Sequence, residues 1–150
     1  MKIFFVCTGN TCRSPMAEAI LTAKELPGVE VRSAGIFAGE APLSANAQTV
    51  LDGAGISFEH TSKQLLPNDM EWATLILTMT NSHKQFLLQH YPAFAGKLYT
   101  LKEFASGTAS DVSDPYGGSL FTYQQTFNEL KALIDRVVEK FTEEEMTEKK

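Results

Sequence analysis

The chain has 150 residues, of which 43% are hydrophobic and 21% are charged, and this composition predicts one domain over residues 1–150. The net charge of −5 argues against nonspecific binding to nucleic acid. No apolar run reaches the roughly 18 residues of a membrane span, and two cysteines are too few for a secreted disulfide scaffold, so a cytoplasmic location is expected.

The first predicted strand covers residues 2–6, whose unbroken apolar run is typical of a parallel strand buried on both faces. Cys7 therefore stands at the carboxyl end of this strand. The pair Ser14-Pro15 predicts the start of a helix, with Ser14 as its candidate N-cap. A strand, a tight loop and a helix N-terminus in succession present backbone N–H groups to an anion.

A cysteine and an arginine bracket this loop. The thiolate of Cys7 would be a nucleophile for phosphorus, and the planar guanidinium of Arg13 can hold two phosphate oxygens. The spacing alone leaves open that Cys7 is a small buried residue that only ends a strand. The flanking strand and helix favour the phosphate-binding interpretation.

Strands and helices continue to alternate along the chain. The sequence predicts three more strands, at residues 29–32, 75–79 and 97–101. It predicts further helices at residues 44–51, 68–73, 82–91 and 120–141, with 142–150 as a frayed tail. This alternation indicates a three-layer α/β fold with a four-stranded parallel sheet between helices. Ligands bind such sheets where the strand order reverses, and the first strand is the candidate for that position.

Residues 105–119 show neither helical nor strand periodicity, and such a long loop in a compact domain is usually functional. Within it, Pro115 favours an extended backbone at Asp114, and Tyr116 adds an aromatic side chain. A phosphoenzyme mechanism needs one group to protonate the leaving group and then to activate water, and Asp114 is the candidate. Asp111 is the competing carboxylate, and a solvated turn aspartate is the alternative interpretation of Asp114.

Three segments together carry a family resemblance: CTGNTCRS at residues 7–14, PMAEA at 15–19 and DVSDPYGGS at 111–119. Over essentially the whole chain, the sequence resembles the low-molecular-weight protein-tyrosine phosphatase family. The resemblance implies a hydrolase that uses neither metal nor cofactor and works in two steps through phosphocysteine. A metal site is also disfavoured because His60, His83 and His90 form no close pair that could join the two cysteines.

The resemblance also implies a role for individual residues. Cys7 would be the nucleophile, Arg13 the phosphate clamp, and Asp114 the general acid and later the base. The residues implied to surround phosphate and substrate are Thr8, Gly9, Asn10, Thr11, Cys12 and Tyr116. The residues implied to support the loop by hydrogen bonds are Asn10, Ser14, Ser33 and His60. Asparagine suits the left-handed backbone expected in the loop, whereas His60 on its own would be interpreted as a partly exposed histidine after a turn.

Thr11 bears on the substrate. Tyrosine-directed members of the family typically carry an apolar branched residue directly after the loop asparagine. The hydroxyl of Thr11 weakens packing on a phenol ring and offers a hydrogen-bond acceptor to a cationic group. CTGNTCRS thus resembles the bacterial protein-arginine phosphatases of the family, so arginine-phosphorylated proteins are the expected substrates, with phosphotyrosine as the alternative. In that case the carboxylate of Asp114 would also face the guanidinium of the substrate.

Cys12 suggests redox control, because a sulfenic acid at Cys7 can be trapped as a disulfide by a neighbouring thiol. The alternative is that Cys12 only packs in the loop. A related arsenate reductase is disfavoured because no cysteine follows Cys12 to relay the disulfide. A noncatalytic phosphoprotein-binding module is disfavoured because it would need neither a nucleophile nor an acid. We expect a monomer without nucleic-acid or membrane partners.

Overall fold

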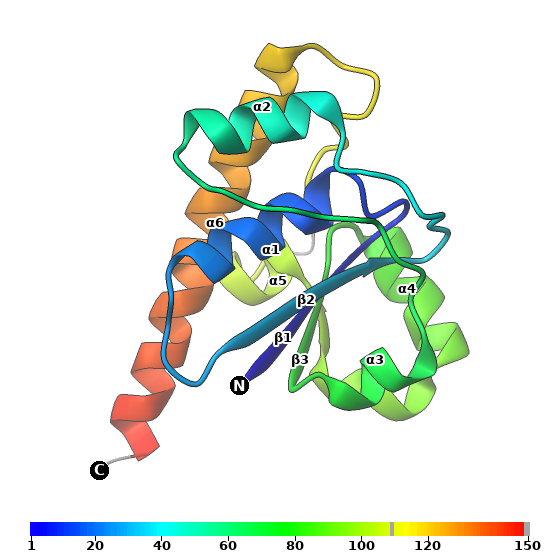
Figure 1. Ribbon diagram of the computed structural model, residues 1–150. Coiled ribbons are helices and arrows are strands. Elements are labelled where there is room, and N and C mark those ends of the chain that lie inside the picture. The colour runs from blue at the N-terminus through cyan, green and yellow to red at the C-terminus, as the bar shows by residue number, and fades with distance from the viewer. Residues whose placement is uncertain (109, 149–150) are drawn as a thin grey trace.

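The structure is a computed structural model that describes residues 1–108 and 110–148, with side chains up to residue 141. A four-stranded sheet in the order β2-β1-β3-β4 lies between two layers of helices (Figure 1). Its strands are β1 (Lys2–Cys7), β2 (Glu30–Gly35), β3 (Leu75–Thr78) and β4 (Leu98–Thr100). All three strand pairings are parallel, so the predicted three-layer α/β fold is confirmed.

The helices divide between the two faces of the sheet. One face is covered by α1 (Arg13–Ala23), α2 (Ala45–Gly53), α5 (Leu101–Ser106) and α6 (Leu120–Glu148). The other is covered by α3 (Pro67–Trp72), α4 (Asn81–His90) and the 3-10 helix η1 (Pro92–Lys97). None of the helices in the described part of the chain is long and apolar enough to cross a membrane.

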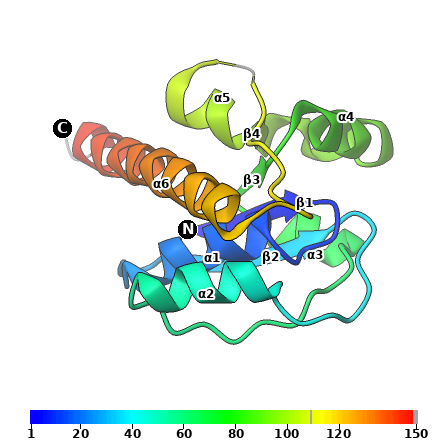
Figure 2. The same ribbon diagram turned by 90° about the horizontal axis from the view of Figure 1, so that it is seen from above.

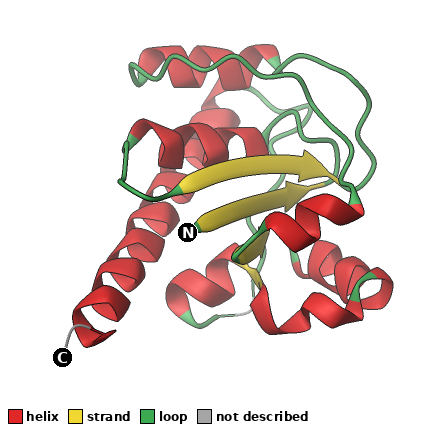
Figure 3. Cartoon of the chain, turned by 60° about the horizontal axis from the view of Figure 1, so that its bottom comes forward, coloured by secondary structure: helices red, strands yellow, loops and turns green. Residues whose placement is uncertain are grey.

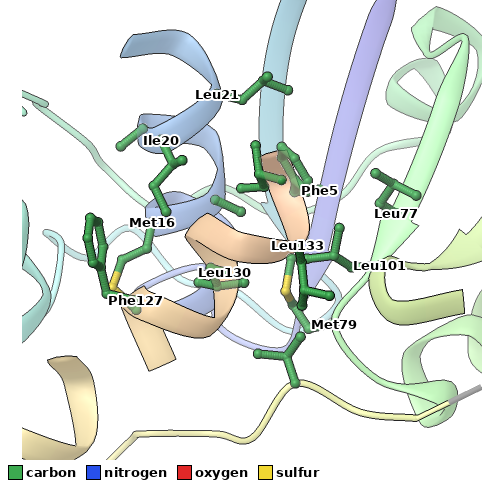
Figure 4. Packing of buried hydrophobic residues seen from close by; sticks show 14 of the residues in the cluster. Phe5, Met16, Ile20, Leu21, Leu77, Met79, Leu101, Phe127, Leu130 and Leu133 are labelled. Atoms are coloured by element: carbon green, nitrogen blue, oxygen red, sulfur yellow. The ribbon is translucent and has the colours of Figure 1, made fainter. Parts of the chain in front are cut away.

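Strand β1 forms the centre of the core because its residues alternate between the two faces. Phe5 belongs to the cluster beneath α1 and α6, and Phe4 to the cluster beneath α3 and α4, and both are fully buried. Figure 4 shows part of the first cluster, in which Met16 of α1 and Phe127 of α6 lie close together. This burial on both faces explains the unbroken apolar run of residues 2–6.

The chain places β2 on one side of β1 and β3 on the other, so the strand order reverses at the carboxyl end of β1. The two long strand arrows in Figure 3 point the same way, towards the side where the loops gather. Crevices at such reversal points bind ligands in parallel α/β sheets. The fold therefore puts Cys7, the last residue of β1, at the preferred place for a site.

Two local predictions were wrong around helix starts. Helix α1 begins at Arg13 and receives no side-chain cap, because Ser14 lies inside its first turn and the Ser14 hydroxyl lies 2.8 Å from Sγ of Cys7 instead. The predicted strand 97–101 is shortened to Leu98–Thr100, and α5 follows from Leu101 to Ser106, so that its last two residues fall in the predicted loop 105–119. The reason is a capping box, in which Thr100 and Glu103 exchange side-chain and backbone hydrogen bonds.

Helix α6 is longer than the predicted helix 120–141, since it continues to Glu148 through residues that were predicted as a frayed tail. This segment contains no glycine or proline and is rich in glutamate, which has a high helix propensity. The preceding turns of the helix are anchored in the core, as far as Phe141. Residues 149–150 of the predicted tail lie outside the described residues.

Candidate active site

A pocket of about 270 Å³ opens at the carboxyl end of β1. Its lining consists of residues 7–13 together with Asp114 and Tyr116. Figure 2 shows the segment before α6, in yellow, beside the loop between β1 and α1, in dark blue. The structure thus brings together the nucleophile, clamp and acid candidates from positions about a hundred residues apart, next to the positive end of the α1 dipole.

Cys7 is almost fully buried at the bottom of this loop. Its Sγ lies 2.8 Å from Oγ of Ser14. Ser14 Oγ also accepts a hydrogen bond of 2.8 Å from Nδ2 of Asn10. Because that bond uses the Ser14 oxygen as an acceptor, its hydroxyl proton is free to point at the sulfur, where it stabilises the thiolate.

Asn10 holds the loop in its turn. Its backbone has a φ of 58°, the left-handed conformation that the sequence predicts. Its Nδ2 donates to Ser33 Oγ at 2.9 Å as well as to Ser14, and its Oδ1 accepts from the backbone N–H of Lys63 at 3.1 Å. Ser33 in turn donates to Glu18. Burial raises the pKa of the Glu18 carboxyl above its ordinary value, and the hydrogen bond from Ser33 offsets only part of that rise. The side chain of Asn10 is therefore satisfied on both ends and fixes the loop.

His60 contacts the same residue from the opposite side. Its Nε2 donates to the backbone carbonyl of Asn10 at 2.8 Å, and its ring stacks on Phe58. Burial lowers the pKa of His60, although the hydrogen bond to Asn10 opposes that shift, so the ring is uncharged at neutral pH. This geometry favours the supporting role over a partly exposed turn histidine.

Gly35, at the end of β2, permits the close approach of the loop and was missed by the sequence analysis. A Cβ atom at this position would lie 2.5 Å from the carbonyl oxygen of Thr8 and 3.1 Å from the backbone nitrogen of Asn10. Any side chain would therefore push the loop away from β2. The sequence gives little local signal for this role, because the closest clash is with Thr8, which lies 27 positions earlier.

Arg13 is 5% exposed and points into the pocket from the first turn of α1. One terminal nitrogen donates to the carbonyl of Val112 at 3.0 Å, and the other lies 3.5 Å from Oδ2 of Asp114. Its Nε has no hydrogen-bond partner among the residues that the structure describes. Buried donors in proteins are normally paired, so this N–H is suited to an oxygen of a bound phosphate.

Asp114 reaches the pocket from the loop before α6. Its carboxylate is 54% exposed, and its Oδ1 accepts from the backbone N–H of Tyr116. The competing carboxylate, Asp111, accepts instead from the backbone N–H of Asn81 at 2.8 Å, at the start of α4. The contacts therefore favour Asp114 over Asp111 as the acid.

The sequence analysis missed His83, which it considered only as a possible metal ligand. Nε2 of His83 lies 2.8 Å from Oγ1 of Thr8, in the catalytic loop. Burial, followed by the positive charge of Arg13, lowers the pKa of His83 to about 4, so the ring is uncharged at neutral pH. Its place just after β3, a neighbour of β1, is the signal that points to the site.

The Cys12 side chain contacts a residue of α6. Its Sγ lies 3.3 Å from the hydroxyl of Tyr123 and 3.5 Å from that of Ser44. Burial raises the pKa of the Tyr123 phenol, which therefore stays protonated at neutral pH. Tyr123 has no local sequence signal for this contact, because it lies more than a hundred positions after Cys12.

These contacts define what the pocket can do chemically. It combines a buried thiol beside a hydroxyl donor, a guanidinium with an unpaired N–H, and an exposed carboxylate within reach of that guanidinium. In such a site the guanidinium can bind a tetrahedral dianion and the thiolate can attack its central atom. The carboxylate can transfer a proton to or from the leaving group.

Comparisons with known proteins agree with this geometry. Residues 2–149 match the family described as low molecular weight phosphotyrosine protein phosphatase. A relative from Geobacillus stearothermophilus, named protein-arginine-phosphatase, is 49% identical over 96% of this chain and 98% of its own. A relative from Staphylococcus haemolyticus, named low molecular weight protein-tyrosine-phosphatase PtpB, is 42% identical over 91% of this chain and 97% of its own. The solved structure of the YwlE arginine phosphatase from Geobacillus stearothermophilus superposes with a TM-score of 0.95 at 48% identity, covering 97% of this chain and 96% of the other.

Proposed function

Because this chain belongs to the low molecular weight phosphotyrosine protein phosphatase family, we propose that it hydrolyses phosphoarginine in proteins through a phosphocysteine intermediate. The observation that carries the proposal is the position of Thr11, which lines the pocket directly after Asn10, where tyrosine-directed members of the family typically carry an apolar branched residue. The high similarity to a protein-arginine-phosphatase over nearly the full chain supports the same substrate.

In the first step, the Cys7 thiolate attacks phosphorus and the phosphorus–nitrogen bond breaks. Arg13 and the backbone N–H groups of the loop bind the phosphate oxygens and stabilise the charge of the transition state. The released guanidine is strongly basic, and the carboxyl group of Asp114 supplies its proton. The products of this step are phosphocysteine and the free arginine side chain.

In the second step, the Asp114 carboxylate takes a proton from a water molecule, which attacks the phosphorus of phosphocysteine. The sulfur–phosphorus bond breaks, phosphate leaves, and the thiolate is released beside the Ser14 hydroxyl. The half-exposed position of Asp114 suits this dual role, since its carboxylate is open to water and next to Arg13.

Substitution of Thr11 tests the substrate. The native chain is expected to hydrolyse phosphoarginine peptides with a higher kcat/KM than phosphotyrosine peptides of the same sequence. Thr11→Ile should shift that ratio towards phosphotyrosine by about tenfold or more, because the branched side chain packs on a phenol ring and removes the polar contact. Thr11→Val removes the hydroxyl at nearly constant volume, so it isolates the polar contact and should shift the ratio in the same direction as Thr11→Ile. A native preference for phosphotyrosine would contradict the substrate while leaving the phosphatase mechanism intact.

The second candidate substrate is phosphotyrosine, which is favoured by the similarity to the relative named protein-tyrosine-phosphatase. Tyr116, which is 78% exposed at the pocket rim, does not discriminate between the two, because its ring can pack on a phenol or on a guanidinium. The peptide comparison above decides between them.

We also propose reversible redox control at Cys7 and Cys12, which are both free thiols lining the pocket. Peroxide would oxidise the Cys7 thiolate to sulfenic acid, and attack by the Cys12 thiol would then form a disulfide and release water. The Cys12 side chain must leave Tyr123 and Ser44 to make this bond.

Treatment with peroxide and then with a dithiol tests this control. The native chain is expected to recover nearly all of its activity, because the disulfide protects Cys7 from further oxidation. Cys12→Ser should recover only in part, because its unprotected sulfenic acid proceeds to the irreversible sulfinic acid. Full recovery of Cys12→Ser would show that Cys12 has no protective role.

The proposal places this enzyme in a bacterial cytoplasm as a monomer, acting on arginine-phosphorylated proteins without nucleic-acid or membrane partners. Its two free cysteines support that location, since thiol chemistry at Cys7 needs a reducing compartment.

A further inference from the structure

A second pocket, of about 220 Å³, lies next to the catalytic one. It is lined by Thr8, Ile36, Phe37, Ser82, His83 and Phe86. Thr8 lines both pockets, so the two adjoin at this residue. A polypeptide whose phosphorylated residue occupies the first pocket can therefore place a neighbouring residue at the second.

Phe37 dominates the open side of this second pocket. Its side chain is 72% exposed, which is unusual for a phenylalanine in a folded domain. The exposed ring is nevertheless held in place, because it makes an edge-to-face contact with Phe86 at 5.7 Å. Phe86 itself stacks on His90. An exposed aromatic side chain that is fixed against a second one offers a binding surface at little entropic cost.

The second pocket is also uncharged. Of its six described lining residues, none is Asp, Glu, Lys or Arg. His83 adds no charge at neutral pH, since burial and then the Arg13 charge lower its pKa to about 4. The walls of this pocket therefore favour an apolar group over the phosphate and the guanidinium that the first pocket suits.

We propose that this second pocket binds an apolar side chain of the substrate protein, one or two residues away from its phosphoarginine. The proposal rests on the proposed function and adds a preference for the sequence around the modified arginine. Neighbouring residues of an extended chain are roughly 3.3 Å apart, so only residues near the phosphoarginine can reach a pocket that shares Thr8 with the catalytic one. A closed apolar cavity of about 150 Å³ holds benzene, so the second pocket has room for a leucine or a phenylalanine side chain.

Five synthetic peptides test this proposal. Each carries one phosphoarginine in a serine background, four of them with a single leucine at position −2, −1, +1 or +2, and the fifth with none. For the native chain, leucine at one of these positions is expected to raise kcat/KM about fivefold or more over the all-serine peptide, through burial of its side chain. Phe37→Ser should reduce the ratio of kcat/KM for the leucine peptide to kcat/KM for the all-serine peptide to about one, because it removes the exposed wall of the pocket. This ratio is compared between variants because a general change in activity affects both peptides equally.

Phe121→Ser is the matched control, since Phe121 of α6 is 69% exposed and does not line the second pocket. It should retain the leucine preference. Equal kcat/KM values for all five peptides with the native chain would contradict binding of an apolar substrate side chain in the second pocket, and would leave phosphoarginine hydrolysis intact. Loss of the preference in Phe121→Ser but not in Phe37→Ser would also contradict this binding. Hydrolysis of an aryl phosphate without turnover of any phosphoarginine peptide would instead overturn the proposed function, and the pocket with it.

Discussion

Cys7→Ser is expected to lower kcat for p-nitrophenyl phosphate by at least about 10⁴-fold. The physical reason is that a serine hydroxyl remains protonated at neutral pH, and the neighbouring Ser14 hydroxyl is a hydrogen-bond donor to Cys7 rather than a base. The measurement is steady-state release of p-nitrophenolate, with the native chain as reference.

Two controls separate loss of the nucleophile from loss of the fold. Cys7→Ser should still bind inorganic phosphate, because Arg13 and the loop N–H groups are unchanged. Cys12→Ser makes the same change of atom five residues later and should retain turnover within about tenfold, because its sulfur contacts Tyr123 rather than the site of attack. Substantial turnover by Cys7→Ser would contradict the phosphocysteine mechanism. A native chain that binds phosphate but hydrolyses no aryl phosphate would favour the phosphoprotein-binding module.

Asp114→Asn is expected to lower kcat for a phosphoarginine peptide by about 10² to 10⁴-fold, the usual contribution of a general acid–base group. The loss should be smaller for p-nitrophenyl phosphate under single-turnover conditions, because p-nitrophenolate departs without a proton. The expected signature is therefore a dependence on the leaving group. Rapid-quench measurement of the first turnover with both substrates provides this comparison.

Asp111→Asn is the matched control for the acid. It makes the same change in the same loop, and its remaining carbonyl oxygen can still accept the hydrogen bond from Asn81. Activity within about threefold of the native value is expected. If Asp111→Asn shows the larger loss with phosphoarginine, the roles of the two carboxylates are reversed.

The main elements of the fold are readable from periodicity alone. The apolar run at residues 2–6 predicts β1, because a strand covered on both faces has no polar side to interrupt it. The start of α5 was missed because its capping box begins at Thr100, within a segment whose apolar residues also read as a strand. The last turns of α6 were missed because a highly charged segment resembles a solvated tail, although its residues favour a helix.

By themselves, the residues of the sequence determined the catalytic loop, since Cys7, Asn10 and Arg13 are neighbours along the chain and local backbone geometry directs them to one anion. The tertiary structure decided the rest. Its contacts favour Asp114 over Asp111, place His83 against Thr8, and leave no room for a side chain at Gly35 beneath the loop. Gly35 ends β2, His83 lies in the first turn of α4, and Asp114 lies in the loop before α6, and no sequence spacing relates them to Cys7. Gly35 and His83 reach the loop because the sheet order places the carboxyl ends of β2 and β3 on either side of β1, whereas Asp114 reaches it from the segment that precedes α6. These contacts depend on the pairing of strands that are distant in the sequence, and no local pattern carries that information.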